Sequence, residues 1–360
     1  MVPMRPVPGL MSDSILATFL QCLEIALFLC GFITQSYFLI RMRRIGLLHF
    51  NLKVLLSSFS LAYVIVALTR LLNYAEDWIA KDSNTLTVLQ GQRCFIRRLF
   101  YDTAINVVSI AMASFAFERL LATVYSHKYE QIDGRRAGIL VGVLVWLISF
   151  AGALFMFLEN LARFDFWHKP IPFDTCDILK TFPKALQLIA IIAAICYVFT
   201  AVSFITVHIH NRRISNQIAT SSASHSLSLR YQHAENISTT RFLSVIVATF
   251  GVDLFCSCFS LFYVTLNSSK EPDLLVEILS VAYNIVDASY SFLFPLMCIL
   301  LHRPLQDQLK KDLKRVICWN RWRNQEAQKN EVHVRTVSGK TIPLRENSKT
   351  YFESLQQMWN

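Results

Sequence analysis

The sequence predicts an all-α membrane protein folded as a bundle of seven transmembrane helices. Hydrophobic residues make up 54% of its 360 residues and charged residues only 17%, and the mean hydropathy is +0.40. A soluble domain of this length rarely carries so apolar a composition. Seven apolar runs are each long enough to cross a hydrocarbon core of about 30 Å. They cover residues 15–40, 51–72, 94–119, 137–158, 182–208, 242–266 and 274–301.

The segments on either side of this 15–301 region differ from it in character. Residues 1–14 hold three prolines and no apolar run, and the run that follows is too long for a signal peptide and lacks a small-residue cleavage site. We therefore expect a retained first span. Residues 302–323 combine an apolar stripe with lysines, arginines and tryptophans, which predicts an amphipathic helix on the inner membrane surface. Residues 324–360 are polar, and we expect little fixed structure there.

The distribution of lysine and arginine predicts that the N-terminus lies outside, because basic residues concentrate in the loops on the cytoplasmic side. With this orientation the inner loops hold Arg41, Arg43, Arg44, Lys53, Arg119, Lys128, Arg135, Arg136, Arg212, Arg213, Arg230 and Arg241. Asn267, followed by Ser268 and Ser269, then becomes a glycosylation acceptor in an outer loop. On the inner side, Cys318 is a candidate for palmitoylation. An unmodified thiol at the interface is the alternative.

The third run carries chemically distinct groups at its two ends. Read as one helix from Cys94 to Arg119, it covers roughly 37 Å, which places the thiol on one side of the membrane and Glu118-Arg119 on the other. Cys176 is the single cysteine of the next outer loop. Both thiols would face the oxidising side, where a bridge between Cys94 and Cys176 can persist. The alternative is that both are unbridged, since Cys is a common small hydrophobe in membrane helices.

Polar side chains inside the spans are candidates for function, because lipid makes their burial costly. The candidates for a ligand cavity are Arg98, Asp102, Asn106, Asp253, Asn284 and Asp287. The first three recur every four residues on one stripe of the third span, so Arg98 and Asp102 can pair. The alternative is that these groups only join helices by hydrogen bonds worth about 0.6 kcal/mol each. Glu24 is either an outer-leaflet carboxylate or a cavity residue, and we expect Arg70 to extend to the outer interface.

Several motifs resemble known seven-helix receptors. Glu118-Arg119, together with the cysteine arrangement, resembles the rhodopsin-like receptors, although Leu120 replaces the aromatic residue after the arginine and Pro295 stands outside any Asn-Pro-x-x-Tyr sequence. FERLLATVYSHKYE after the third span and SLSLRYQHAENISTTRFLSVIV at the sixth are similar to the nematode serpentine chemoreceptors. Within that group the chain looks most like class epsilon, in the wider class alpha group.

The resemblance implies a chemosensory G-protein-coupled receptor in the plasma membrane, at the cilium of a sensory neuron. A small-molecule ligand would bind among the helices from outside, and the inner side would signal to a heterotrimeric G protein. The residues expected at this inner switch are Glu118, Arg119, Arg230, Tyr231 and Glu235. If Glu235 approaches Arg119, the two form a charged latch across the third and sixth spans. The alternative is a solvated helical face.

Other classes of function fit the sequence less well. The nine histidines lie in loops, at helix ends or in the tail, so we expect no metal site, no cofactor and no enzymatic activity. The basic residues form no continuous domain, so we expect the lipid bilayer and not nucleic acid as a partner. The rival is a seven-span transporter or channel subunit that uses Asp102, Asp253 and Asp287 as an ion relay. Transporters commonly contain repeated halves, and the sequence shows none.

Overall fold

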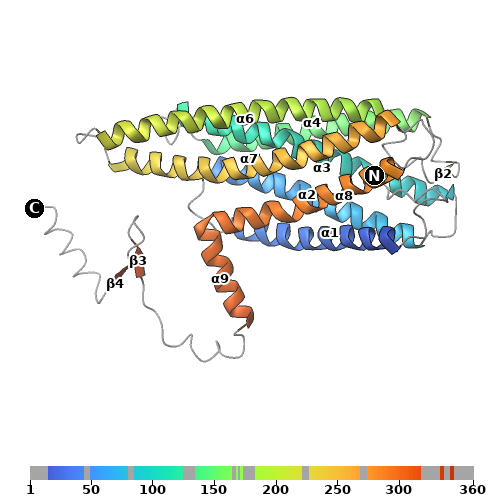
Figure 1. Cartoon of the computed structure of the whole chain (residues 1–360), viewed down its shortest axis with the longest axis horizontal. Helices are drawn as coiled ribbons and strands as arrows, with labels where there is room; N and C mark the ends of the chain where they lie inside the picture. Colours follow the sequence, from blue (N-terminus) through green and yellow to red (C-terminus); the bar gives the residue numbers. More distant parts are fainter. Residues whose placement is uncertain are drawn as a thin grey trace, which may run out of the picture. The chain divides into compact units, whose positions relative to one another are not determined.

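The computed structural model describes residues 15–43, 49–79, 85–124, 134–163, 168, 171–172, 183–220, 227–267, 274–317, 333–335 and 341–343. Seven long helices dominate the described chain (Figure 1). They are α1 (Ile15–Met42), α2 (Phe50–Ile79), α3 (Val88–Val124), α4 (Gly134–Arg163), α6 (Pro183–Thr220), α7 (Leu227–Asn267) and α8 (Leu274–Leu301). Each is long and apolar enough to cross a membrane. The predicted seven-helix all-α fold is confirmed.

The helix α3 begins before the apolar run does, because a polar cap starts it. The backbone N–H of Gln90 donates to the hydroxyl of Thr87 at 3.4 Å, and the N–H of Thr87 donates to Oε1 of Gln90 at 3.0 Å. This reciprocal pair is a capping box, which satisfies N–H groups that have no partner in a first turn. The cap adds nearly two turns ahead of Cys94.

The helix α3 lies at the centre of the bundle. It packs against α2, α4, α6 and α7, while α1 packs between α2 and α8, and α7 packs between α6 and α8. An aromatic core joins four of these helices around Phe59 of α2. Its ring centroid lies 5.8 Å from that of Phe115 in α3, 6.3 Å from Phe250 in α7 and 4.5 Å from Phe294 in α8. The packed rings therefore fix the positions of α2, α7 and α8 relative to α3.

A proline inside α8 creates a second link between helices. Pro295 has no N–H to donate to the carbonyl of Ser291, four residues earlier. Gln35 of α1, which is fully buried, donates from Nε2 to this carbonyl at 2.8 Å. Ser60 of α2 in turn donates its hydroxyl to the side-chain oxygen of Gln35. The break in the α8 ladder is thus satisfied by α1 and α2, and three helices are joined at one point.

Short strands pair at the end of the bundle where α3 begins. The strand β1 (Thr85–Leu86) runs antiparallel to β2 (Ile171–Pro172), with Thr85 opposite Pro172 and Leu86 opposite Ile171. This pairing brings the segment before α3 beside the segment that follows α4. A second pair, β3 (His333–Arg335) with β4 (Thr341–Pro343), lies in the C-terminal tail, where the sequence predicts little fixed structure.

An amphipathic helix, α9 (Arg303–Ile317), follows α8 directly. Leu305, Leu309 and Leu313 are spaced four residues apart and share one face, whereas lysines and arginines occupy the others. Lys310 and Lys311 are exposed. The predicted helix after the seventh span is present in the structure, and the rest of the predicted 302–323 segment, with Cys318, lies outside the described residues.

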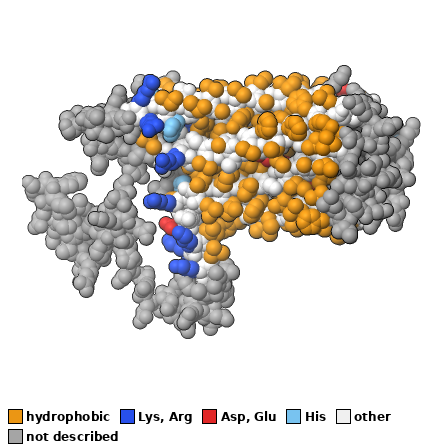
Figure 2. All heavy atoms as spheres, viewed as in Figure 1, with side chains coloured by type: hydrophobic (Ala, Val, Ile, Leu, Met, Phe, Trp, Pro, Cys, Tyr) orange, Lys and Arg blue, Asp and Glu red, His pale blue; other side chains and the backbone are white. Residues whose placement is uncertain are grey.

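A band of hydrophobic side chains covers the middle of the bundle, and lysines and arginines gather at one end of that band (Figure 2). We call this the basic end; it is where α1, α3, α6 and α8 end and where α2, α4 and α7 begin. Its exposed or half-buried cations are Arg41, Arg43, Lys53, Arg212, Arg213, Arg241 and Arg303. The apolar band is the surface that a bilayer requires.

The close contact of α2 with α4 generates a test of the packing. A Cβ added at Gly138 of α4 would lie 2.8 Å from the Cα of Asn51 in α2, where nothing can move aside cheaply. We expect Gly138→Ala to lower the melting temperature of the purified protein by a few degrees, because overpacking costs about 1–3 kcal/mol.

Gly152→Ala in the same helix is the matched control. Its Cβ would meet only the side-chain nitrogen of Asn106, at an ordinary 3.6 Å. Both variants gain the same helix propensity, so equal melting temperatures would contradict the close approach of the two backbones.

Candidate functional site

A buried ion pair joins α1 to α2 in the half of the bundle away from the basic end. Arg70 donates from Nη2 to the carboxylate of Glu24, and the two residues are 1% and 3% exposed. The guanidinium also lies over two rings, 5.8 Å from the centroid of Phe28 and 5.6 Å from that of Tyr74. The expectation that Arg70 extends to the interface is therefore wrong, because Glu24 holds its charge inside the protein.

A second ion pair lies on α3, as its spacing predicts. Nε of Arg98 lies 3.4 Å from Oδ2 of Asp102, and both residues are buried. Asn106, one turn further, donates instead to the backbone carbonyl of Ser149 in α4, at 3.5 Å. The structure thus brings Arg98 and Asp102 together and places Asn106 at a helix contact.

Two further carboxylates approach this region from α7 and α8. Asp287 is 8% exposed and lies within electrostatic range of Arg70 and Glu24. Asp253 lies within electrostatic range of Asp287. Tyr101 of α3 interacts in the same way with Asp287, Arg70 and Asp102. We call Glu24, Arg70, Arg98, Asp102, Asp253 and Asp287 the polar cluster.

The other predicted cavity residue, Asn284, lies one turn before Asp287 in α8 and is 9% exposed. The sequence identifies four members of the polar cluster from their cost in lipid. It leaves Glu24 open and misplaces Arg70. Glu24 and Arg70 carry opposite charges at similar depth in neighbouring spans, and this pattern could have predicted their pairing.

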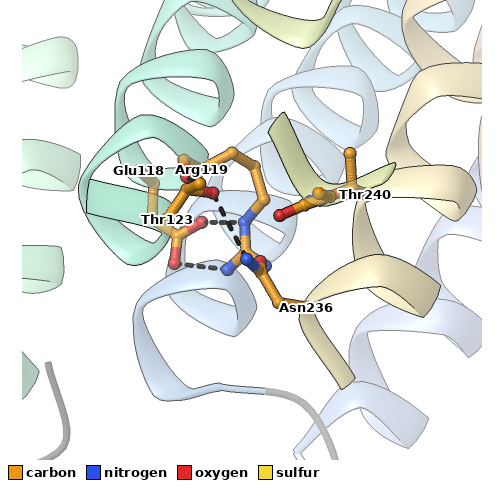
Figure 3. Close-up of polar contacts among 6 residues, drawn as sticks. Glu118, Arg119, Thr123, Asn236 and Thr240 are labelled. Carbon is orange, nitrogen blue, oxygen red and sulfur yellow. Dashed lines mark hydrogen bonds and ion pairs between the residues drawn. The ribbon is translucent and has the colours of Figure 1, made fainter. Parts of the chain in front are cut away.

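A second polar group lies near the basic end, where Arg119 ends the predicted third span (Figure 3). Its guanidinium donates two parallel hydrogen bonds to the neighbouring Glu118, from Nε to Oε2 at 2.5 Å and from Nη2 to Oε1 at 2.6 Å. Both side chains are buried, at 4% and 5% exposure. Two parallel hydrogen bonds between a guanidinium and a carboxylate make a bidentate ion pair, which is the strong form of an arginine–carboxylate contact.

Asn236 of α7 connects this pair to a second helix. Its side-chain oxygen accepts from Nη1 of Arg119 at 3.4 Å, and its amide nitrogen donates to the hydroxyl of Thr123 at 3.3 Å. Thr123 also donates to the backbone carbonyl of Arg119. One asparagine on α7 thus bonds to two residues one turn apart on α3.

A neighbouring contact extends the connection to α6. Asn211 donates to the hydroxyl of Thr240, one turn after Asn236, at 3.3 Å. Side-chain hydrogen bonds therefore join the ends of α3, α6 and α7. We call Glu118, Arg119, Thr123, Asn211, Asn236 and Thr240 the basic-end network.

The remaining predicted switch residues lie in α7, but their side chains are outside the described part of the structure: Arg230, Tyr231 and Glu235. Arg119 contacts the next residue along α7, Asn236, and a contact between Arg119 and Glu235 stays a prediction. Adjacent residues of a helix point about 100° apart, and the sequence cannot fix that rotation.

The residues predicted for modification lie at the opposite end of the bundle or beyond the described chain. Cys94 lies in the second turn of α3 and is disulfide-bonded. Cys176 lies outside the described residues, so its pairing with Cys94 stays a prediction. Asn267 is the last residue of α7, away from the basic end.

The buried ion pair between α1 and α2 generates a test of stability. We expect Glu24→Leu to lower the stability of the purified protein by about 3–5 kcal/mol, because it leaves the buried charge of Arg70 without its carboxylate. The double variant Glu24→Leu/Arg70→Leu removes both charges and should recover most of this loss. Thermal unfolding measures both, and a double variant no more stable than the single one would refute a paired burial.

The chain is similar to known proteins over most of its length. The family model described as serpentine type 7TM GPCR receptor class ab chemoreceptor matches residues 9–332. The probable G-protein coupled receptor F27E5.8 of Caenorhabditis elegans is 23% identical over 354 residues, which cover 95% of this chain and 92% of that protein. The serpentine receptor class alpha/beta-14 of the same organism is 22% identical over 323 residues, covering 87% and 81%.

These similarities confirm the expectation of a nematode-type serpentine chemoreceptor and favour it over the transporter or channel. They refine one detail, since the matching class is ab, whereas the sequence motifs indicate epsilon. The chain belongs to the class ab family of serpentine seven-transmembrane, G-protein-coupled chemoreceptors.

Proposed function

We propose that the protein detects an external small molecule, which binds at the polar cluster, and that it signals to a heterotrimeric G protein at the basic end. The observation that supports this most directly is the contact of Asn236 with Arg119 and Thr123. It ties α7 to α3 by two hydrogen bonds, so the separation of α7 from α3 at this end breaks no covalent bond.

The basic-end network acts as the restraint of the resting state. Hydrogen bonds of this kind contribute about 0.5–1.5 kcal/mol each, so the loss of both bonds of Asn236 changes the ratio of two states by roughly five- to 150-fold. When α7 moves away, Arg119 loses Asn236 and becomes accessible to the G protein. Glu118 keeps the guanidinium in place while the partner on α7 changes.

The N-terminus lies outside and the basic end lies in the cytoplasm. The cations gathered at that end support this orientation, because basic residues are retained on the cytoplasmic side. The helix α9 lies on the inner surface of the plasma membrane with its lysines toward the headgroups. Because the chain belongs to a chemoreceptor family, we place the protein in a sensory neuron, at the cilium.

A Cys94–Cys176 bridge closes the outer side. The pairing of β1 with β2 supports it, since it holds the segment before α3 beside the segment that leads to Cys176. Such a bridge fixes the outer end of α3, so that movement is confined to the inner ends of the helices.

The basic-end network generates a test of signalling. We expect Asn236→Leu to raise ligand-free nucleotide exchange on the G protein roughly five- to 150-fold, because it removes both α3–α7 hydrogen bonds. Ser244→Ala is the matched control in the same helix, since its hydroxyl bonds only within α7, to the carbonyl of Thr240. We expect Arg119→Ala to abolish exchange while surface expression is kept. Unchanged exchange in Asn236→Leu, or full exchange in Arg119→Ala, would defeat the proposed switch.

The orientation and the bridge generate a test in intact cells. A tag at the C-terminus should stain only after permeabilisation, and Cys94→Ser and Cys176→Ser should each reduce surface delivery to the same extent. Cys196→Ser, which alters a free thiol of α6, should leave delivery unchanged. Staining of intact cells would reverse the orientation, and normal delivery of both bridge variants would remove the bridge.

A further inference from the structure

We propose that the polar cluster binds an organic cation, an amine or guanidinium compound with an apolar body, between Asp253 of α7 and Asp287 of α8. This names the ligand class of the receptor and therefore rests on the function proposed above. Four observations of the described residues support it: charge balance, unsatisfied carboxylates, aromatic neighbours and an adjoining apolar cluster.

The charges of the polar cluster do not balance. Arg70 donates to Glu24, and Arg98 pairs with Asp102, so each arginine is already matched by one acid. Asp253 and Asp287 then have no cation of their own within the cluster. Carboxylates buried at low dielectric stay ionised only with a compensating charge or with hydrogen bonds.

The hydrogen bonds are missing as well. Asp287 is 8% exposed, and no described residue donates a hydrogen bond to it. Oδ1 of Asp253 is shielded from solvent and accepts from no described residue. Asn284, one turn before Asp287, is 9% exposed and also makes no hydrogen bond within the described chain. Since buried polar groups in proteins are almost always satisfied, the shielded Oδ1 of Asp253 needs a partner that the described chain does not supply. Asp287 and Asn284 on the neighbouring helix are available to the same partner.

Tyrosine side chains lie within electrostatic range of one or both carboxylates. Tyr63 of α2 and Tyr283 of α8 lie within electrostatic range of both Asp253 and Asp287, and Tyr101 lies within range of Asp287. The face of an aromatic ring attracts a cation, by about 0.5–2 kcal/mol depending on its exposure. The arrangement therefore suits a charged nitrogen group better than a neutral or an anionic ligand.

A cluster of apolar core side chains lies beside the same carboxylates. Tyr283 packs against a cluster of buried side chains from α4, α6 and α7, formed by Met156, Ala190, Leu261 and Val264. Cys258, which also packs there, lies within electrostatic range of Asp253. A ligand with its nitrogen at Asp253 and Asp287 can place a hydrocarbon group against this cluster, which favours an organic cation.

A metal ion fits this place less well. Within the described residues no group of three or more His, Cys, Asp and Glu side chains could hold one. Hard divalent cations require about six oxygen ligands in close geometry. Two carboxylates with aromatic faces are enough for an ammonium group.

The test measures thermal unfolding of the purified full-length receptor in detergent with phenethylammonium chloride as the probe. We expect a saturable rise in melting temperature of a few degrees at millimolar concentration, because a ligand that binds the folded state stabilises it by mass action. The isosteric neutral 2-phenylethanol, and sodium chloride at equal ionic strength, should produce none. Asp253→Asn and Asp287→Asn should each weaken the apparent affinity at least tenfold.

Glu76→Gln is the matched control, since this carboxylate of α2 pairs with Arg93 and Arg97 outside the polar cluster. It should keep the ammonium effect. The proposal is overturned if the ammonium salt has no effect, if the alcohol or sodium alone has the same effect, or if the effect survives both Asn substitutions. Having two single variants keeps the test valid if one of them fails to fold.

G-protein exchange measured on the same preparations separates the two proposals. Basal exchange without an ammonium effect would defeat the ligand class and leave the receptor function standing. An ammonium effect with no exchange under any condition would defeat the receptor function and leave the cation site standing.

Discussion

The hydrocarbon core of a bilayer offers no water to polar groups, so a buried polar group is stable there only when another residue or a bound ligand satisfies it. That constraint explains the contacts that join its helices. Gln35 of α1 bonds the carbonyl of Ser291 that Pro295 leaves without a donor, and Ser60 of α2 bonds Gln35. Glu24 and Arg70 neutralise one another between the same two helices. The polar pairs fix which helices are neighbours, and packed rings around Phe59 fill the space between them.

The helices α3 and α7 each carry residues of both the polar cluster and the basic-end network. Arg98 and Arg119 lie on α3, about 31 Å apart at 1.5 Å per residue, and Asp253 and Asn236 lie on α7, about 25 Å apart. A continuous helix is stiff over such lengths, so a displacement of α7 at the polar cluster is carried to Asn236. A ligand that binds better to one position of α7 than to the other shifts the population between them. Asn236 ties α7 to α3 by two hydrogen bonds, so a small difference in ligand-binding free energy is enough to shift this population.

The sequence predicts the bundle because its evidence is local. Each apolar run contains the information for its own helix, and the costly polar residues within it identify most of the polar cluster. The pairing of Glu24 with Arg70 joins residues 46 positions apart. It depends on which helices become neighbours, and the sequence does not contain that information in any one segment. For the same reason Arg70 looks from its own span like a residue that extends to the interface.

The contact of Asn236 with Arg119 shows a second limit. The motif around Glu235 points to this turn of α7, but it does not show that Asn236 bonds to α3, because that depends on the rotation of the helix. The cap at Thr87 is a different case. Thr87-x-x-Gln90 is a helix-start motif that can be recognised in the sequence, but hydropathy does not detect it because its residues are polar.

We propose that α7 leaves α3 at the basic end when the receptor signals. This proposal is tested most directly by pulsed electron resonance distances between site-specific spin labels at Val124 of α3 and Ile237 of α7, both exposed. The purified receptor is compared alone and bound to a nucleotide-free heterotrimeric G protein. We expect the G protein to lengthen the distance between the two spin labels by several ångströms, on the order of one helical turn. The same distance distribution in both states would contradict it.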